Sequence, residues 1–350
     1  MQILIVKTSA LGDIIQCYPV LNYLKALDPT VHIDWIVEEA AQDLVSRHPY
    51  VRSALPIQSK LWRKQLLHPN TWSQISTFKR KLQSTYYDVV FDLQGNCKSA
   101  VFTAMARGRV KVGFGRRSVP ESPNLLVTQR RFDPDSRLNV RDRYIFLLES
   151  FFGQKHPATS GPALLLTDQE RSHIEHIATK WASAVIVCPH SRWTNKQVPM
   201  RLLAAALREL QQETGLPYLL SWGNAQERAT AEDLCIGLEA ELLPALSLPE
   251  FQGLMARAVA VVSMDSLPLH LCGTTSTPCF GFFGPSLGSI YSPSGVDSSY
   301  HQGTCPYNEH FMTRCRKLRS CATGACMATT SERTLVDWWH QRIASKSTDA

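Results

Sequence analysis

A buried strand that runs directly into a helix start is the feature that most constrains the fold of this chain. Residues Val259–Val262 are apolar and β-branched without polar alternation, a pattern typical of a strand covered on both faces in a parallel sheet. Asp265 and Ser266 follow, and both residue types cap helices well. Pro268 suits a first helical turn, and Cys279–Phe283 predicts the next buried strand. The stretch therefore predicts a β–α–β unit.

The start of that predicted helix is suited to binding an anion. A helix that begins at a strand end presents free N–H groups and the positive end of its dipole, and these bind phosphates without a metal. Asp265 can also accept hydrogen bonds from sugar hydroxyls. The same residues suit an ordinary β–α–β unit in which Asp265 only caps the helix, and this stretch alone favours neither interpretation.

Length and composition indicate a globular protein of two domains. The chain has 350 residues, of which 44% are apolar and 19% charged, values that fit two α/β domains. No apolar run is long enough to span a bilayer. The N-terminus enters a strand at once and carries Asp13 where a signal peptide would be apolar. We therefore expect a cytoplasmic protein.

Positive charge is concentrated in the first half of the chain. Residues 51–143 contain 18 Lys and Arg but only 6 Asp and Glu, whereas the whole chain has a net charge of +7. Such a surface predicts an anionic partner: a nucleic acid, an anionic membrane or a phosphorylated glycolipid. No zinc-finger, RNP or helix-turn-helix pattern is present, which disfavours nucleic acid.

Candidate site residues of the first half follow predicted strands. The strand Ile3–Val6 leads into a helix that we expect from Asp13 to about Leu27, and the strand Tyr87–Leu93 is followed by Lys98. Ligands of open α/β sheets bind at this carboxyl edge, although Asp13 taken alone suits a helix N-cap better. Further basic candidates for an anionic acceptor, or for a merely solvated face, are Lys60, Arg63, Lys64, Arg116 and Arg117.

The second half repeats the pattern after a linker. Residues 153–163 are rich in Gly, Pro, Ser and Thr, and Pro157 and Pro162 suit a hinge. Ala184–Cys188 predicts the first strand of a second domain, followed by a polar loop that reaches Lys196. The expected domains are residues 1–155 and 164–330, with an amphipathic helix over 331–346 that we expect to pack on the N-terminal domain.

Several short motifs, in order along residues 1–290, resemble those of the ADP-heptose:lipopolysaccharide heptosyltransferases. Val6-Lys-Thr-Ser-Ala-Leu-Gly-Asp13 is similar to the opening motif of that family. Asp265-Ser-Leu-x-x-His270, followed by Phe282-Phe-Gly-Pro285, resembles its Asp-Thr/Ser-Gly-x-x-His and Gly-Pro signature. Trp62-Arg-Lys64, Asp92-Leu-Gln-Gly95 and Trp222-Gly223 match between them. One departure is Leu267, where the family usually has Gly, which allows a backbone to approach phosphate closely.

The resemblance assigns roles to residues of this chain. It makes Asp13 the catalytic base, Lys196 a phosphate ligand and Glu227 a ribose ligand. Ser191 and Thr194 both remain candidates for the hydroxyl that replaces a threonine pair of the family. The remaining donor-binding candidates are Leu246 at the adenine, Asp265, Ser266, Leu267 and His270; the acceptor candidates are Lys60, Arg63, Lys64, Lys98, Arg116 and Arg117.

The fold and reaction implied by the resemblance are those of a GT-B enzyme, with two Rossmann-like domains facing a central cleft. Within the family, heptosyltransferase I is the expected match. The implied reaction is inverting transfer of heptose from ADP-L-glycero-D-manno-heptose to the Kdo-lipid A inner core of lipopolysaccharide, or to a first heptose. We expect no cofactor, no metal and no nucleic-acid partner, and a cytoplasmic enzyme in peripheral contact with the inner membrane.

Two other classes of function stay open. A nucleotide-sugar epimerase of the same fold would act on the donor alone, and a catalytically silent glycolipid-binding protein is suggested by Leu267. No Gly-x-Gly-x-x-Gly is present, which disfavours a dinucleotide oxidoreductase.

Asp133-Pro-Asp135 mimics a metal-binding Asp-x-Asp motif but follows no clear strand, so we interpret it as a turn. Cys305, Cys315, Cys321 and Cys326 favour a reduced structural cluster over a zinc site.

Overall fold

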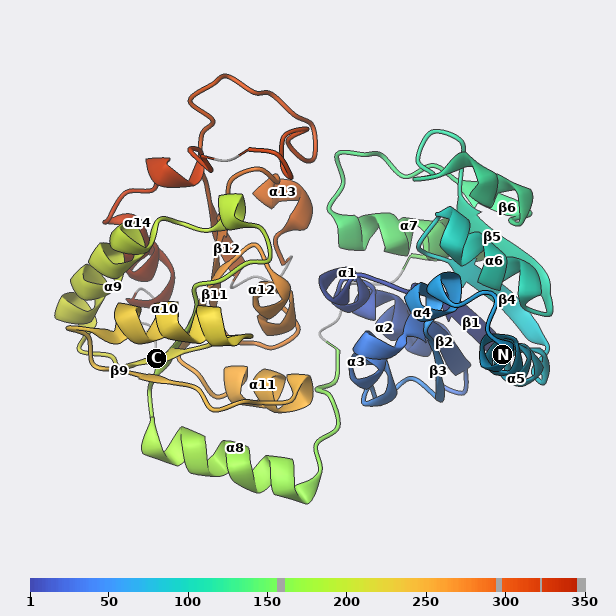
Figure 1. Ribbon diagram of the computed structural model, residues 1–350, viewed down its shortest axis with the longest axis horizontal. Helices are drawn as coiled ribbons and strands as arrows, with labels where there is room; N and C mark the ends of the chain where they lie inside the picture. The colour runs from blue at the N-terminus through green and yellow to red at the C-terminus, as the bar shows by residue number, and fades with distance from the viewer. Residues whose placement is uncertain (156–160, 294–297, 322, 345–350) are drawn as a thin grey trace. The chain divides into compact units, whose positions relative to one another are not determined.

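The computed structural model describes residues 1–155, 161–293, 298–321 and 323–344. It divides into two compact units, Met1–Leu165 and Leu166–Ala350. Each unit contains one six-stranded sheet (Figure 1). The predicted linker, 153–163, lies just before this division, and Pro157 within it lies outside the described residues.

The first unit alternates strands and helices. Its strands are β1 (Gln2–Val6), β2 (His32–Glu38), β3 (Ser53–Ile57), β4 (Tyr87–Asp92), β5 (Gly108–Phe114) and β6 (Arg130–Phe132). Its helices are α1 (Leu11–Ile15), α2 (Tyr18–Leu27), α3 (Gln42–Ser46), α4 (Ser59–Lys64), α5 (Pro69–Gln83), α6 (Cys97–Met105) and α7 (Val140–Phe152), with 3₁₀ turns η1 (Glu39–Ala41) and η2 (Ser122–Leu126).

The strand order of the first sheet is β3-β2-β1-β4-β5-β6, and every pairing is parallel. This is the strand order of a Rossmann sheet. β2 and β3 are added outward on one side of β1, and the later strands, from β4 on, are added on its other side. Helices cover both faces: Val90 packs in one cluster with Phe78 of α5, while the neighbouring Phe91 meets Phe151 of α7, with ring centroids 5.7 Å apart. The buried strands of this sheet therefore form the core of the unit.

The helix predicted from Asp13 to Leu27 is wrong in two respects: it begins at Leu11, with Ala10 rather than Asp13 at the N-cap, and it is two helices. α1 ends at Ile15 and α2 begins at Tyr18. Pro19 stands in the first turn of α2, where its missing N–H costs nothing, but the same residue inside one continuous helix would break the hydrogen-bond ladder. The break leaves Asp13 on a helix of a single turn close to the end of β1.

The second unit repeats the alternation. Its strands are β7 (Val185–Cys188), β8 (Tyr218–Leu220), β9 (Ala240–Leu242), β10 (Ala260–Met264), β11 (Cys279–Phe283) and β12 (Ser298–Gln302). Its helices are α8 (Asp168–Lys180), α9 (Met200–Thr214), α10 (Ala225–Cys235), α11 (Leu248–Met255), α12 (Leu267–Cys272), α13 (Gly288–Tyr291) and α14 (Thr334–Trp339), with 3₁₀ turns η3 (Thr194–Lys196) and η4 (Met327–Thr329) and a π-helical turn η5 (His340–Ala344).

The second sheet has the same Rossmann order as the first. Read from β9 at one edge, it runs β9-β8-β7-β10-β11-β12, again with parallel pairings throughout. The predicted α/β fold with two Rossmann-like domains is thus confirmed. In each sheet the strand order reverses beside the first strand, between β1 and β4 and between β7 and β10, and such switch points are where open α/β sheets bind ligands.

The C-terminal helix belongs to the second unit, not to the N-terminal domain as the sequence suggested. α14 lies beside α9 (Figure 1), and Leu335, Val336 and Trp338 are buried in the core of the second sheet. The Trp338 ring packs on Phe280 of β11 with centroids 5.1 Å apart. Periodicity shows that a helix has an apolar face but not which surface receives it. Residues 345 and 346 of the predicted helix lie outside the described part of the chain.

Among the described residues, no helix combines the length and the apolar character needed to cross a bilayer.

Candidate active site

The candidate residues of the first unit all follow the carboxyl ends of parallel strands. Asp13 comes after β1, Lys98 after β4, and Arg116 and Arg117 after β5. Lys60, Arg63 and Lys64 lie on α4, which follows β3. Since the strands run parallel, these segments leave the sheet at the same edge. The structure therefore assembles the acceptor-binding candidates and the candidate base along one edge of the first sheet.

Asp13 lies near a buried cation. Its carboxylate accepts a hydrogen bond from the N–H of Ala10 at 3.2 Å, and the side chain remains partly exposed. The cation is Lys7, whose ammonium group donates to the Tyr144 hydroxyl at 2.8 Å and to the Leu93 carbonyl at 3.3 Å. Burial opposes charge on Lys7, but Tyr144 and Asp13 outweigh it and raise the pKa of this lysine. The raised pKa favours the charged form of Lys7 near the carboxylate.

Lys98 is held in a polar cluster at the same edge. Its ammonium group lies 2.8 Å from Glu38 Oε1 and 3.4 Å from Ser9 Oγ. Glu38 also accepts a hydrogen bond from the Ser59 hydroxyl, which connects it to the first residue of α4. Asn96 caps α6 by accepting from the Ser99 N–H, which fixes the turn that carries Lys98. The cluster ties β2, α4 and α6 together.

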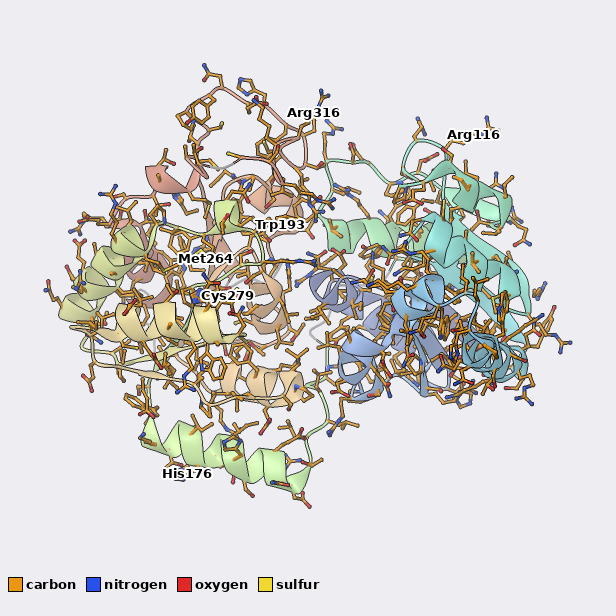
Figure 2. All side chains as sticks on the ribbon, in the orientation of Figure 1. Arg116, His176, Trp193, Met264, Cys279 and Arg316 are labelled. Atoms are coloured by element: carbon orange, nitrogen blue, oxygen red, sulfur yellow. The ribbon has the colours of Figure 1, made fainter. Side chains whose placement is uncertain are left out.

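The two arginines after β5 are exposed, and the side chain of Arg116 extends from the end of the unit (Figure 2). Arg117 Nε lies 3.7 Å from Asp133 Oδ2, and Asp133 also accepts hydrogen bonds from the N–H of Arg117 and the Ser118 hydroxyl. Asp135 pairs with Arg137 at 2.6 Å, an interaction that lowers the pKa of Asp135 to about 2. Asp133 directly follows β6, so the expectation that no strand precedes this segment is wrong, but both of its carboxylates are engaged in turn contacts.

A buried ion pair forms the centre of the second unit's candidate site. Lys196 Nζ lies 2.5 Å from Asp265 Oδ2, and only 11% and 6% of the two side chains are exposed. Lys196 ends the turn that follows β7, and Asp265 directly follows β10. These are the two strands between which the order of the sheet reverses. The geometry places a cation and an acid at the switch point.

Asp265 has further polar partners besides Lys196. The Ser286 hydroxyl donates to Oδ2, and His270 Nε2 lies 3.9 Å from Oδ1. Burial alone would raise the pKa of Asp265, but the charges of Lys196 and His270 and the hydrogen bonds from Lys196 and Ser286 outweigh burial and lower it. Asp265 does not cap α12: Ser266 occupies the N-cap position and makes no side-chain capping bond. The interpretation of Asp265 as an ordinary helix cap is therefore wrong, and its contacts lie in this cluster instead.

The loop after β7 is fixed on two sides. The buried Ser191 hydroxyl donates to the Asp265 carbonyl at 3.2 Å, whereas Thr194 is exposed. Trp193, labelled in Figure 2, lies near the guanidinium groups of Arg192 and Arg319, at 5.9 and 5.7 Å from its ring centroid. These two arginines add positive charge to the loop that carries Lys196.

Glu227 and Leu246 lie at the same edge but outside the buried cluster. Glu227 Oε2 accepts from the Gly223 N–H at 2.8 Å, and its carbonyl lies 2.8 Å from His190 Nε2. Leu246 follows β9 and is half-buried. Near it, a pocket of about 500 Å³ is lined by Trp222, Arg228, Leu243 and Ala245 among others, although Leu246 is not among its lining residues.

The four cysteines near the C-terminus do come together. Cys305, Cys315, Cys321 and Cys326 are free thiols that line one small cavity of about 30 Å³, beside Asn195 of the loop after β7. Asn195 donates a hydrogen bond to the Leu318 carbonyl, so this segment supports the loop that carries Lys196. Within the described ranges, no group of three or more His, Cys, Asp or Glu side chains is placed to hold a metal ion.

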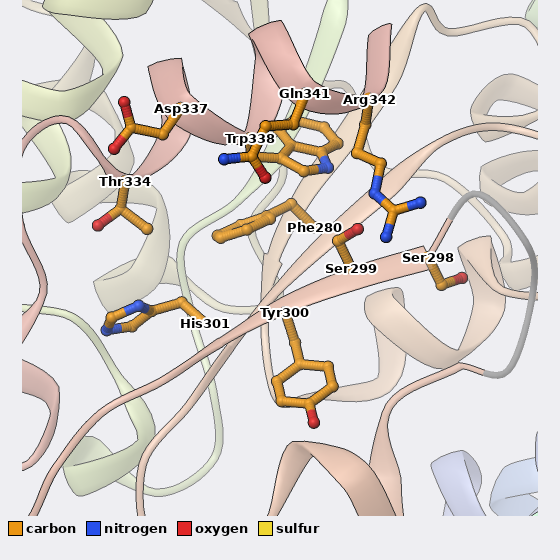
Figure 3. A pocket seen from close by; sticks show the side chains of 10 residues that line it. All are labelled: Phe280, Ser298, Ser299, Tyr300, His301, Thr334, Asp337, Trp338, Gln341 and Arg342. Carbon is orange, nitrogen blue, oxygen red and sulfur yellow. The ribbon is translucent and has the colours of Figure 1, made fainter.

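A second pocket of about 460 Å³ lies between β12 and α14 (Figure 3). Arg342 and Trp338 face Ser299 across it, and the indole N–H of Trp338 is buried without a hydrogen-bond partner among the described residues. None of the residues assigned from the sequence lines this pocket.

Three contributors were not identified from the sequence. Ser286, Lys7 and Tyr144 make the contacts described above. Ser286 directly follows Gly284-Pro285 at the end of β11, and Lys7 stands in the opening motif, so these two had a visible signal and Tyr144 had none. Tyr144 lies 137 residues from Lys7, so nothing local in the sequence relates the two.

Comparisons with known proteins identify relatives of this chain. The model of glycosyltransferase family 9 (heptosyltransferase) matches residues 75–342. Lipopolysaccharide heptosyltransferase 1 of Pseudomonas aeruginosa is 31% identical over 290 residues, which cover 82% of this chain and 79% of that one. The Escherichia coli K12 protein of the same name is 26% identical, over 82% of this chain and 88% of its own length.

Solved structures show the same fold. The E. coli heptosyltransferase WaaC with ADP superimposes with a TM-score of 0.80 at 24% identity and covers 98% of this chain and 100% of that one. A family 9 glycosyltransferase of Veillonella parvula gives a TM-score of 0.81 at 16% identity, over 98% of this chain and 97% of its own. With the family model matching well over half of its length, this chain belongs to glycosyltransferase family 9, the heptosyltransferases.

Proposed function

We propose that this protein transfers heptose from ADP-L-glycero-D-manno-heptose, with inversion, to the Kdo-lipid A inner core of lipopolysaccharide. The observation that carries the proposal is the pair of switch points: a carboxylate and basic groups in one unit, and a buried Lys196–Asp265 pair in the other. The Pseudomonas and E. coli relatives, each named lipopolysaccharide heptosyltransferase 1, support this substrate class.

Asp13 acts as the general base in this mechanism. It takes the proton of the acceptor hydroxyl as that oxygen attacks the anomeric carbon of the heptose. The Ala10 N–H donates to this carboxylate and helps to hold it in place for the proton transfer, and the charge of Lys7 lies nearby. Lys60, Arg63, Lys64, Lys98, Arg116 and Arg117 bind the anionic groups of the acceptor.

The second unit binds the donor. Negative charge develops on ADP as the glycosidic bond breaks, and Lys196 with the Ser266 end of α12 stabilises it. Asp265 holds Lys196 in position until phosphate arrives. Ser191 or Thr194 supplies a hydroxyl, Glu227 binds ribose, Leu246 contacts adenine, and Leu267 and His270 complete the phosphate side. This supply of positive groups makes the transfer independent of a metal ion.

The test is the release of ADP from ADP-heptose in the presence of Kdo₂-lipid A or of an already heptosylated core. Release that depends on Kdo₂-lipid A supports the proposal, and release only with the heptosylated core would assign the second acceptor instead. An epimerase would convert the donor without acceptor. A silent binding protein would bind acceptor tightly and release no ADP.

We further propose that the enzyme works in the cytoplasm in peripheral contact with the inner membrane, because its acceptor is an anionic glycolipid and the basic candidates of the first unit are mostly exposed.

A further inference from the structure

The segment from α4 to the end of α5, residues 59–83, has an unusual surface, and we refer to it as the α4–α5 hairpin. It is anchored inside: Trp62 and Phe78 are buried in the core of the first sheet with ring centroids 5.9 Å apart. Trp62 also donates a hydrogen bond to Gln74 across the hairpin at 2.8 Å. The hairpin is therefore a firmly attached part of the first unit, and its outer surface has a defined shape.

Large apolar side chains crowd the tip of this hairpin. Leu67 is 100% exposed, Leu66 and Leu61 are exposed to 47% and 39%, and Trp72 to 59%. The Trp72 indole N–H donates to the Leu66 carbonyl at 2.7 Å, which holds the ring against the turn between the helices. Single exposed apolar residues are common on proteins, but a contiguous group of this kind marks an interaction surface.

Every charged side chain of the hairpin itself is positive. Residues 44–87 contain no Asp or Glu, and the hairpin itself carries Lys60, Arg63, Lys64, Lys79, Arg80 and Lys81. All six are exposed, and in the described part of the chain none forms an ion pair. On α5, Thr71, Phe78 and Leu82 face the core, and Lys79 follows Trp72 by two helical turns. Lys79 thus shares a side of α5 with the exposed indole.

We propose that the α4–α5 hairpin docks on an anionic phospholipid bilayer, with Leu66, Leu67 and Trp72 entering the headgroup region and the lysines and arginines facing lipid phosphates. An apolar tip and basic surroundings are the two features that hold interfacial segments on anionic membranes, and Trp favours the boundary itself. A partner protein with an acidic groove would fit the charge but has no need of a fully exposed leucine at a turn.

The α4–α5 hairpin is then the surface through which the enzyme meets the membrane. Only the reason for docking, access to a lipid-embedded acceptor, rests on the proposed function. Docking here brings α4, which carries the acceptor candidates Lys60, Arg63 and Lys64, toward a lipid-embedded acceptor. Membrane binding itself needs neither donor nor acceptor, so it can be measured when no transfer occurs.

The first experiment is co-sedimentation of the full chain with vesicles of phosphatidylcholine, with and without phosphatidylglycerol. We expect binding only to the anionic vesicles, and we expect Leu66→Ser with Leu67→Ser to weaken it by at least about tenfold. Leu126→Ser is the matched control, because Leu126 is 88% exposed in the same unit but lies outside the hairpin. Unchanged binding of the double variant, or equal loss in the control, would overturn the proposal.

A second pair of variants tests the charges. Lys79→Gln with Lys81→Gln should lower binding by about fivefold per charge and reduce its salt dependence. Arg201→Gln with Arg208→Gln removes two exposed charges from α9 and should leave binding unchanged. Equal effects of the two pairs would show that net charge alone acts, which contradicts a hairpin-specific surface.

Trp72 provides a direct report of insertion. Lipids brominated on their acyl chains should quench part of the tryptophan fluorescence of the wild type, and Trp72→Phe should remove that component. If instead the Leu66→Ser, Leu67→Ser variant turns a dimer into a monomer in sedimentation velocity while neither form binds vesicles, the tip is a contact between two copies and the proposal fails.

Turnover separates this inference from the proposed function. The Leu66→Ser, Leu67→Ser variant should transfer heptose to a deacylated, soluble acceptor at the wild-type rate, and lose activity only on acceptor embedded in anionic vesicles. Equal loss on both acceptors would overturn membrane docking. A wild type that binds vesicles but releases no ADP would refute the proposed function and leave the docking surface standing.

Discussion

Lys196 and Asp265 form an ion pair of 2.5 Å at the switch point of the second sheet, and little of either side chain meets solvent. The two residues lie 69 positions apart, one after β7 and one after β10. Taking two charges out of water is costly unless each is paired and hydrogen-bonded, and Asp265 gains a further partner in Ser286. Such a pair keeps a cation ready for a phosphate group, and this arrangement motivates the first two predictions.

Replacing Lys196 with Ala should weaken the binding of ADP and ADP-heptose together, by about 1.5–3 kcal/mol for a charged hydrogen bond. Calorimetric titration of ADP measures this directly. Arg333→Ala is the control, since Arg333 pairs with Glu209 on the surface of the same unit. An ADP affinity equal to that of the wild type would remove Lys196 from the phosphate site.

Asp265→Asn should destabilise the protein by about 3 kcal/mol at neutral pH, because the little-exposed Lys196 loses its charged partner. The folded-state pKa of Asp265 is lowered, so its contribution to stability is present above the ordinary value of 3.8 and is lost as the pH falls through the folded value. The difference in unfolding free energy between wild type and variant should therefore narrow in acid. Urea unfolding at neutral pH and below 3.8 measures it, and a constant difference would contradict the assignment.

Asp13→Asn should retain the fold and donor affinity but lower turnover by about 10² to 10⁴. The amide still accepts from the Ala10 N–H, so α1 is preserved while the proton acceptor is lost. Single-turnover kinetics at saturating donor measure the effect. Asp43→Asn, at an exposed acid in the first turn of α3, is the control. Turnover like that of the wild type would exclude Asp13 as the base.

Transfer activity should survive EDTA, because we assign the stabilisation of leaving ADP to Lys196 and the start of α12. The assay is ADP release before and after dialysis against the chelator. Loss of activity that Mg²⁺ or Mn²⁺ restores would refute the metal-free mechanism and require Asp133 and Asp135 to leave their turn contacts and serve as ligands.

The double substitution Arg63→Ala with Lys64→Ala should raise the acceptor KM and leave ADP binding unchanged. Both side chains are exposed, so salt should produce the same effect as the double variant, given a Debye length of about 3 Å at 1 M. A soluble acceptor keeps this measurement free of membrane effects, and Lys79→Ala with Lys81→Ala is the matched control on α5. An unchanged acceptor KM at low salt would show that these two charges are only solvated and do not bind the acceptor.

The sequence alone determined the central strands and the edge at which the candidate residues lie. β1, β4, β7, β10 and β11 are buried and apolar, so their composition identifies them, and residues after them in sequence must lie at the carboxyl edge of a parallel sheet. The edge strands β3, β6 and β12 were not predicted. β3 and β12 are largely half-buried and β6 is mostly exposed, none has a continuous apolar run, and Pro56 interrupts the pattern of β3.

Only the tertiary structure decided which partners meet. The Lys7–Tyr144 contact spans 137 residues, and the surface that receives α14 depends on how α9 and β11 pack, so neither follows from local pattern. The periodicity of apolar residues shows that a helix has an apolar face but not which element packs against that face. The same holds for the α4–α5 hairpin: only packing shows that Trp62 and Phe78 fill the core while Leu67 is left in solvent. Local chemistry sets which elements form, and long-range packing sets which side chains remain available to a ligand or a membrane.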